Sequence, residues 1–159
     1  MTMILLALAL AAAPAASTHP AEVEKQLAFI EGDWTIKGLE ANYRDHCTWF
    51  DAHSFIICDT DDRRPGGHHA VAILGWSAAE NHYTYQEYDA SGRSRTEPCY
   101  ANSEKGITCL GEFHTKDGLV QTRSTIWPTT TGLGLRQEKS VNAGPWTNAG
   151  HVAYVRRAP

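Results

Sequence analysis

The sequence lacks an apolar run long enough to cross a membrane. Its N-terminal run, residues 4–13, carries no charge, but it falls well short of the roughly 20 residues that a spanning helix requires. Small residues follow it at positions 13–17, a combination typical of a secretory signal peptide. We therefore expect a signal peptide over residues 1–17 and one exported domain over residues 18–159, located in the bacterial periplasm or outside the cell.

The chain also lacks a large excess of positive or of negative residues. The chain has 14 Lys and Arg against 18 Asp and Glu, and its net charge at pH 7 is −4 with histidine neutral. The cations are scattered along the chain rather than gathered in one stretch. A weakly acidic chain of this kind has no electrostatic footprint for nucleic acid or for anionic lipid. We therefore expect neither as a partner.

Familiar catalytic and metal motifs are missing as well. The chain contains no Gly-x-Ser-x-Gly, no His-x-His and no His-Glu-x-x-His, so nothing indicates a serine nucleophile or a zinc site. His68 and His69 are adjacent, but neighbours on a strand point to opposite faces and cannot easily bind one ion. No catalytic residue and no metal are predicted. Acid–base catalysis by carboxylates stays open, because carboxylate pairs across strands cannot be recognised in a sequence.

Helical patterning is confined to one segment, residues 21–30. Val23, Leu27 and Ile30 recur at helical spacing there, which predicts a helix of two to three turns that ends before Gly32. The rest of the chain reads as short strands separated by turn residues. The predicted strands are residues 34–42, 46–51, 54–59, 69–76, 82–88, 93–101, 106–114, 119–127, 132–141 and 146–157.

Ten consecutive strands joined by tight turns must each bury one face. An open sheet of that size leaves two exposed edges, whereas an up-and-down barrel has none and keeps an interior that can hold a small ligand. We therefore predict an all-β, antiparallel up-and-down barrel of about ten strands, preceded by a short helix. A two-sheet sandwich is the alternative, and the short, even connections favour the barrel.

The four cysteines support this pairing. Folding residues 47–51 back on residues 54–58 places Cys47 opposite Cys58, and the hairpin around residues 103–105 places Cys99 opposite Cys109. Directly opposed residues on antiparallel strands have Cβ atoms roughly 4.5–5.5 Å apart, close to what a disulfide requires. We therefore predict the disulfides Cys47–Cys58 and Cys99–Cys109, and hence an oxidising compartment.

The opening of the domain resembles that of calycin-type barrels such as lipocalins and fatty-acid-binding proteins. A short helix leads into Gly32-x-Trp34 at the start of the first strand. In lipocalins this Trp closes the bottom of the barrel under an Arg from the chain end, so the resemblance implies that Arg156 or Arg157 stacks on Trp34. Later landmarks are similar to a small bacterial family of unknown function with a lipocalin-like barrel. They are residues 73–76, 83–85, 89–92, 144–146 and 154–156.

Aromatic residues are the first candidates for a ligand site, because they offer apolar area with polar tips. They are Trp34, Trp49, Trp76, Tyr83, Tyr85, Trp127, Trp146 and Tyr154. If Trp34 points inward, strand alternation places Glu40 inward too, and Arg123 shares its face with Trp127. Glu40 or Glu97 with Arg123 could then orient a ligand. The predicted ligand-binding residues are Trp34, Glu40, Trp76, Tyr83, Tyr85, Arg123 and Trp127.

Two alternatives apply to these residues. The aromatic side chains could simply fill the barrel, and a slip of one residue in register would turn the charged ones to the solvent. His151 resembles the late-strand histidine that ligates haem in nitrobindin-like barrels, which would make haem a cofactor, although a surface histidine is the simpler interpretation.

The leading hypothesis is a carrier or sensor that binds a small apolar or aromatic ligand inside the barrel, without a cofactor. The alternatives are a haem-binding barrel, an isomerase- or cyclase-type barrel enzyme, and a filled barrel that binds no ligand.

Overall fold

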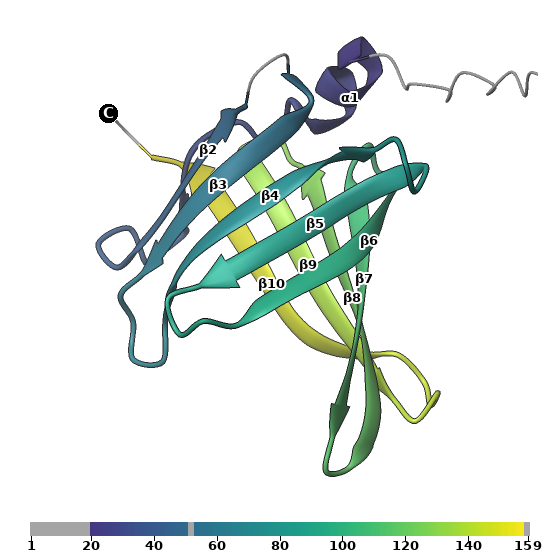
Figure 1. The fold of residues 1–159 in the computed structure, drawn as a ribbon. Helices are drawn as coiled ribbons and strands as arrows, with labels where there is room; N and C mark the ends of the chain where they lie inside the picture. Colours follow the sequence, from purple (N-terminus) through teal and green to yellow (C-terminus); the bar gives the residue numbers. More distant parts are fainter. Residues whose placement is uncertain (1–19, 51–52, 158–159) are drawn as a thin grey trace, which may run out of the picture.

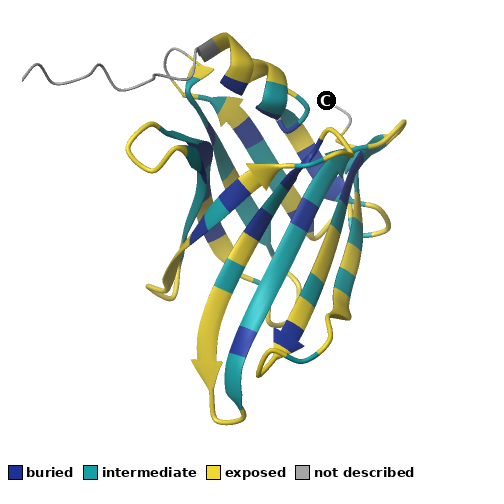
Figure 2. Ribbon diagram, turned by 90° about the vertical axis from the view of Figure 1, so that its right-hand side faces the viewer, coloured by how far each residue is buried: buried dark blue, intermediate teal, exposed yellow. Residues whose placement is uncertain are grey.

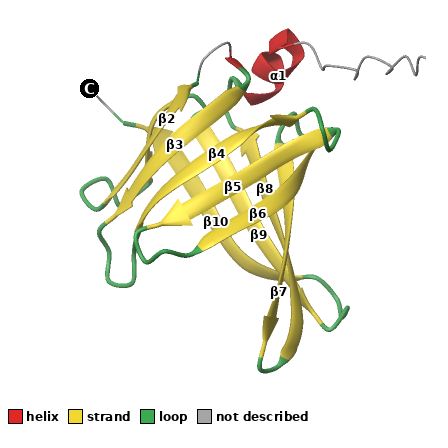
Figure 3. Cartoon of the chain, in the orientation of Figure 1, coloured by secondary structure: helices red, strands yellow, loops and turns green. Residues whose placement is uncertain are grey.

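A computed structural model describes residues 20–50 and 53–157. The expected signal peptide, residues 1–17, lies outside the described residues. The described part is almost entirely β-strand (Figure 3). In chain order its elements are α1 (Pro20–Leu27), β1 (Gly32–Ile36), β2 (Tyr43–Trp49), β3 (Phe55–Asp62), β4 (His69–Ser77), β5 (His82–Asp89), β6 (Ser94–Ala101), β7 (Ile107–Thr115), β8 (Gly118–Pro128), β9 (Gly132–Val141) and β10 (Thr147–Arg156).

The strands form one closed antiparallel barrel (Figure 1). Each strand pairs with its neighbours in sequence, and β1 closes the barrel by pairing with β10, with Trp34 opposite Arg156. Closure leaves no sheet edge free to pair with another chain. The predicted fold, an up-and-down barrel of ten strands behind a short helix, is confirmed.

Helix α1 lies across one end of the barrel (Figure 1). Val23, Leu27 and Ile30 are all at most 5% exposed, so the predicted apolar stripe faces the interior. The indole Nε1 of Trp34 donates to the carbonyl of Ile30 at 2.7 Å and ties the chain after the helix to β1. The helix ends at Leu27, earlier than predicted. No described helix is long and apolar enough to span a bilayer. We call this end of the barrel the helix end and the opposite end the open end.

Both predicted disulfides are confirmed. Cys47 lies directly opposite Cys58 on β2 and β3, and Cys99 lies opposite Cys109 on β6 and β7. The Cα atoms of each pair are 4.0 Å apart. Cys47, Cys99 and Cys109 are buried, so the bridges lie on the inner face of the barrel and mark which residues of these strands point inward.

Strand β1 is shorter than predicted. It ends at Ile36 rather than continuing to residue 42, because the chain turns at Gly38, whose φ of +85° suits glycine. The amide of Leu39 donates to the carbonyl of Ile36 at 2.8 Å, within the same turn. Glu40 therefore lies exposed in the turn, where its carboxylate accepts a hydrogen bond from the Gly38 amide at 2.8 Å. The prediction that Glu40 points into the barrel is wrong.

Arg156 covers Trp34 at the helix end, in the arrangement that the resemblance to lipocalins implies. Its guanidinium carbon lies 4.1 Å from the centroid of the Trp34 ring system. A Cβ at Gly32 would lie 1.6 Å from Nη1 of Arg156, so the missing side chain of Gly32 provides the space for the guanidinium group. The Gly-x-Trp spacing thus builds a slot for one cation.

Replacing Arg156 by Met should lower the free energy of unfolding by about 0.5–1 kcal/mol, because it removes the cation from the indole face but keeps the apolar stem. Urea unfolding followed by tryptophan fluorescence measures this. Arg157→Met is the matched control, because the guanidinium group of Arg157 lies over no aromatic ring of the described residues, and this substitution should leave the stability unchanged. Equal effects of the two substitutions would contradict a specific Trp34–Arg156 contact.

Candidate functional site

The barrel interior contains a cavity of about 360 Å³. Alternate residues of all ten strands line it, as the period of two along a strand requires. Along several strands, β10 among them, less exposed residues alternate with exposed ones over part of the strand (Figure 2). This volume falls at the lower end of the range of about 300–1,000 Å³ that small-molecule pockets occupy. The interior is therefore not completely filled by its side chains.

The lining is graded from apolar to polar. Near the helix end it is formed by large apolar side chains, many of which also belong to the buried core; they are Ile30, Trp34, Leu74, Ile107, Ile126 and Leu133. At the open end the cavity reaches the loop between β3 and β4, where Arg64 and His68 line it and are exposed. The cavity thus has polar residues at its mouth and apolar ones at its bottom.

A network of polar side chains occupies one wall, on β5 and β6. The hydroxyl of Tyr85 donates to Glu87, and Arg95 contacts Glu87 at 2.9 Å and Glu97 at 3.3 Å. Arg95 also lies over the ring of Tyr85, 5.1 Å from its centroid. Glu97 is only 5% exposed, and its burial raises its pKa, although Arg95 opposes this. All four side chains line the cavity.

Two tyrosines and an ion pair line the opposite wall near the mouth. The rings of Tyr43 and Tyr154 are 5.9 Å apart. Burial raises the pKa of Tyr154 to about 12 and raises that of Tyr43 as well, so both hydroxyls are neutral at physiological pH. Arg64 binds Asp62 through two hydrogen bonds of 2.8 and 2.6 Å. This wall therefore presents aromatic rings and neutral hydroxyl groups to the cavity.

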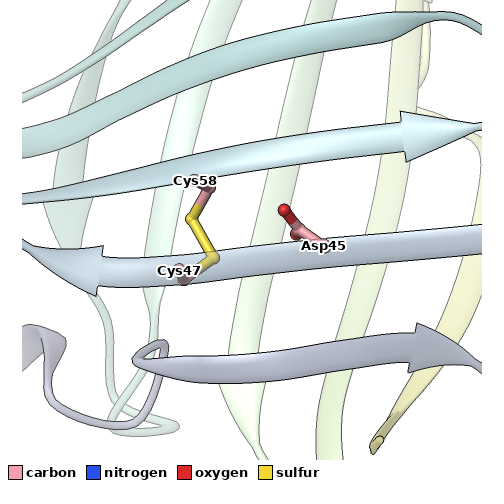
Figure 4. Close-up of side chains that lie close together, drawn as sticks. All are labelled: Asp45, Cys47 and Cys58. Carbon is pink, nitrogen blue, oxygen red and sulfur yellow. A yellow bond between two sulfur atoms is a disulfide. The ribbon is translucent and has the colours of Figure 1, made fainter.

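Asp45 lies on β2, the strand of Tyr43, and lines the cavity beside the Cys47–Cys58 disulfide (Figure 4). Its carboxylate accepts one hydrogen bond, from the Thr60 hydroxyl at 3.0 Å. Burial raises the pKa of Asp45 to about 6, against the effect of the Thr60 hydrogen bond. Asp45 is therefore mostly ionised at pH 7 and becomes protonated near pH 6.

The carboxylate of Asp45 and the sulfurs of Cys47 and Cys58 lie within 4.8 Å of one another. This trio is not a metal site, because both sulfurs belong to a disulfide and are not thiolates. The trio lies at the border between the apolar and the polar half of the cavity.

Four of the five aromatic residues predicted to bind a ligand point inward, and they form two groups. Trp34 and Tyr85 line the cavity. Trp76 and Tyr83 point inward but pack beneath it in an edge-to-face pair with centroids 5.1 Å apart, and both contact the core. The indole Nε1 of Trp76 is buried without a hydrogen-bond partner among the described residues. These two residues form part of the bottom of the barrel and do not line the cavity.

Arg123 and Trp127 lie on the outer face of β8, so the prediction that they point inward is wrong. Their neighbours Ser124 and Ile126 line the cavity instead. Arg123 makes two hydrogen bonds of 2.9 Å to Glu138 on β9, and it does not contact Glu97 or Glu40 in the described structure. The inward set of residues on β8 is thus shifted by one position from the predicted set, and a shift of one residue turns every side chain of a strand to the opposite face.

Trp127 lies flat across Gly134 on the outer face. A Cβ at Gly134 would lie 2.5 Å from the Trp127 ring, so only glycine leaves room for the indole. His151 lies beside it, with the two ring centroids 5.9 Å apart, and is exposed. The histidine proposed as a haem ligand therefore points away from the cavity. His68 and His69 face opposite sides, as expected, since His68 lines the mouth and His69 binds Asp59 outside at 2.6 Å.

The sequence interpretation missed the polar residues of the cavity. Asp45, Thr60, Glu87 and Arg95 all point inward, but charged residues are expected on the outer face of a strand. A usable signal was present. Buried disulfides point inward, and residues two or four positions away on the same strand must do so too. Counting from the cysteines identifies Asp45, Thr60, Glu97 and Arg95.

No protein-family model matches the chain, and no curated protein matches it either.

Proposed function

We propose that the protein binds a small organic molecule with an apolar or aromatic part inside the barrel. One observation carries this proposal: an interior cavity of about 360 Å³ that is covered by α1 at one end and reaches exposed residues at the other. Burying the apolar part of a ligand against the helix-end residues contributes about 25 cal/mol per Å². The polar residues near the mouth fix its orientation.

The placement of the candidate residues favours this function over two alternatives. A filled barrel would leave no cavity of this size, and the haem alternative depends on His151, which lies outside the barrel. We further propose that the protein works after export, in an oxidising compartment, as the two disulfides suggest. The Gly32–Trp34–Arg156 slot supports a calycin-type relationship.

Acid–base catalysis is the second candidate function. It is favoured by Asp45, whose pKa of about 6 lets the carboxyl exchange a proton close to neutral pH inside the cavity. Conversion of a bound molecule, seen as a changed mass or retention time and lost in Asp45→Asn, would favour an isomerase- or cyclase-type enzyme over a carrier.

Filling the cavity should weaken the binding of a ligand inside it. Ala72 lines the cavity on β4, and its neighbour Val71 is 39% exposed on the outer face. We expect Ala72→Phe to weaken any interior ligand by about tenfold or more, which corresponds to about 1.4 kcal/mol, while Val71→Phe leaves the affinity unchanged. The ligands for this comparison are identified by native mass spectrometry of the purified oxidised protein and by a thermal-shift screen of small amphipathic molecules.

The pair of variants decides where a ligand binds. Equal affinities of the wild type and Ala72→Phe would place the ligand outside the barrel and contradict the proposal. The melting temperatures of both variants are compared first, so that a loss of binding is not confused with a loss of folding. A library in which no compound binds the wild-type protein would also overturn the proposed function.

A further inference from the structure

The charges inside the cavity do not balance. Four carboxyl groups and two guanidinium groups line it. Arg64 is held by Asp62, and Arg95 is shared by Glu87 and Glu97. Asp45 is left without a salt bridge among the described residues, and its one hydrogen bond comes from a neutral hydroxyl. The cavity therefore carries an excess of negative charge, and Asp45 lacks a cation.

The neighbours of Asp45 reinforce this imbalance. Asp59 and Glu87 repel its negative charge, and His46 offsets this only in part. Burial of an ionised carboxyl is unfavourable unless a cation or several donors compensate it. An anionic ligand would add to the repulsion, whereas a cationic one would relieve it. The electrostatics of the cavity thus select against acids.

The surroundings of Asp45 suit an amine in particular. Tyr43, Tyr85 and Tyr154 line the same cavity. Arg64 and Arg95 lie over the rings of Tyr43 and Tyr85, which is the contact with a cation that aromatic faces favour. On the other side, Asp45 borders the disulfide Cys47–Cys58 and the apolar helix end. A molecule with an ammonium group next to an apolar body would place its charge at Asp45 and its body against Trp34 and the other helix-end residues.

We infer that the cavity binds small amphipathic amines, with the Asp45 carboxylate as the counter-ion of the protonated amino group. This inference rests on the proposed function and specifies its ligand class. Its predictions concern the preference among ligands of one shape, not whether the barrel binds a ligand at all.

Three indole compounds of similar shape test it: tryptamine, the neutral alcohol tryptophol, and indole-3-propionate. Isothermal titration calorimetry at pH 7.5, where Asp45 is ionised, gives their dissociation constants. A hydrogen bond between charged groups is stronger than a hydrogen bond between neutral ones. We therefore expect tryptamine to bind about tenfold more tightly than tryptophol, and indole-3-propionate to bind most weakly.

The matched variants are Asp45→Asn and Asp59→Asn. Asp45→Asn keeps the shape of the side chain but removes its charge, so it should reduce the affinity for tryptamine about tenfold and leave tryptophol nearly unchanged. Asp59 carries its charge on the outer face, 58% exposed and paired with His69. Its substitution should leave the preference for the amine intact. The melting temperature of each variant confirms that it is folded.

Each outcome bears on one claim. If tryptophol or indole-3-propionate binds as tightly as tryptamine, or if Asp45→Asn keeps the preference, the inference falls while the proposed function stands. If none of the three binds at millimolar concentration, the inference is also overturned, and the library screen with Ala72→Phe and Val71→Phe judges the proposed function independently.

Discussion

Removing both disulfides is expected to lower the free energy of unfolding by about 5 kcal/mol. The bridges join cysteines 11 and 10 residues apart, and a chain-entropy estimate gives about 2.5–3 kcal/mol for each loop of that length. Domains of this size have a total stability of only about 5–15 kcal/mol. A variant with all four cysteines replaced by alanine should therefore be marginally folded at 25 °C. Urea unfolding followed by circular dichroism measures the difference.

Two double variants, Cys47→Ala/Cys58→Ala and Cys99→Ala/Cys109→Ala, separate the contributions of the bridges. Each should lose about half of the total, because the two loops are similar in length. The control is dithiothreitol, which should destabilise the wild type as much as the four substitutions do and should not affect the four-alanine variant. A wild type that unfolds at the same urea concentration with and without reductant would contradict the expected stabilisation.

The fold could be predicted because its determinants are local. Each disulfide joins neighbouring strands of one hairpin, and strands joined by short turns pair with their sequence neighbours. The helix was visible in the spacing of Val23, Leu27 and Ile30. The pairing of β1 with β10 could be predicted because it removes both free edges of the sheet, and it is the one pairing of the described strands that does not join neighbours in sequence.

The inward face of each strand could not be predicted in the same way. Alternation relates residues within one strand, but it does not say which set faces the interior. The error for Arg123 and Trp127 had a specific cause, since a tryptophan was taken to be interior, whereas Gly134 opens a place for it outside. The prediction for Glu40 was wrong for a different reason. Strand β1 ends before the turn at Gly38, so the alternation of side chains along the strand does not extend to Glu40.

The polar lining of the cavity was not predicted, because it inverts the usual distribution of polar and apolar residues on a strand. Val71 and Leu110 are each 39% exposed, whereas Glu97 is 5% exposed. A hydrophobic pattern assigns such strands to the wrong face. Only the disulfides, which are independent of hydropathy, fixed the inner face of β2, β3, β6 and β7, and they point directly at Asp45 and Glu97.

Asp45→Asn is expected to stabilise the protein at neutral pH. Burial raises the pKa of Asp45 from its usual 3.8 to about 6, which means that the fold disfavours the ionised form. The folded state then binds more protons than the unfolded state between these two values, so stability from this group falls as the pH rises from about 4 to about 6. At pH 7 the ionised carboxyl costs at most about 3 kcal/mol, and the carboxamide avoids that cost.

The free energy of unfolding of Asp45→Asn should therefore exceed that of the wild type by an amount that grows with pH, from below about 1 kcal/mol at pH 4 to about 2–3 kcal/mol at pH 7. Urea unfolding at pH 4, 5, 6 and 7 measures it. The control Asp59→Asn removes a nearby exposed carboxyl and should give a small difference that does not follow this profile. A gap that is constant with pH, or a less stable Asp45→Asn at pH 7, would show that Asp45 is not strained by its burial.

The same measurement links stability to the inferred ligand. A bound ammonium group supplies the cation that Asp45 lacks, so it should lower the pKa of the carboxyl and remove the penalty of ionisation. Saturating tryptamine should then stabilise the wild type more than Asp45→Asn and narrow the gap between them at pH 7. Tryptophol, which brings no charge, should stabilise both proteins equally. A carboxyl that destabilises the empty barrel and is relieved by a ligand is the behaviour expected of a binding group rather than of a structural one.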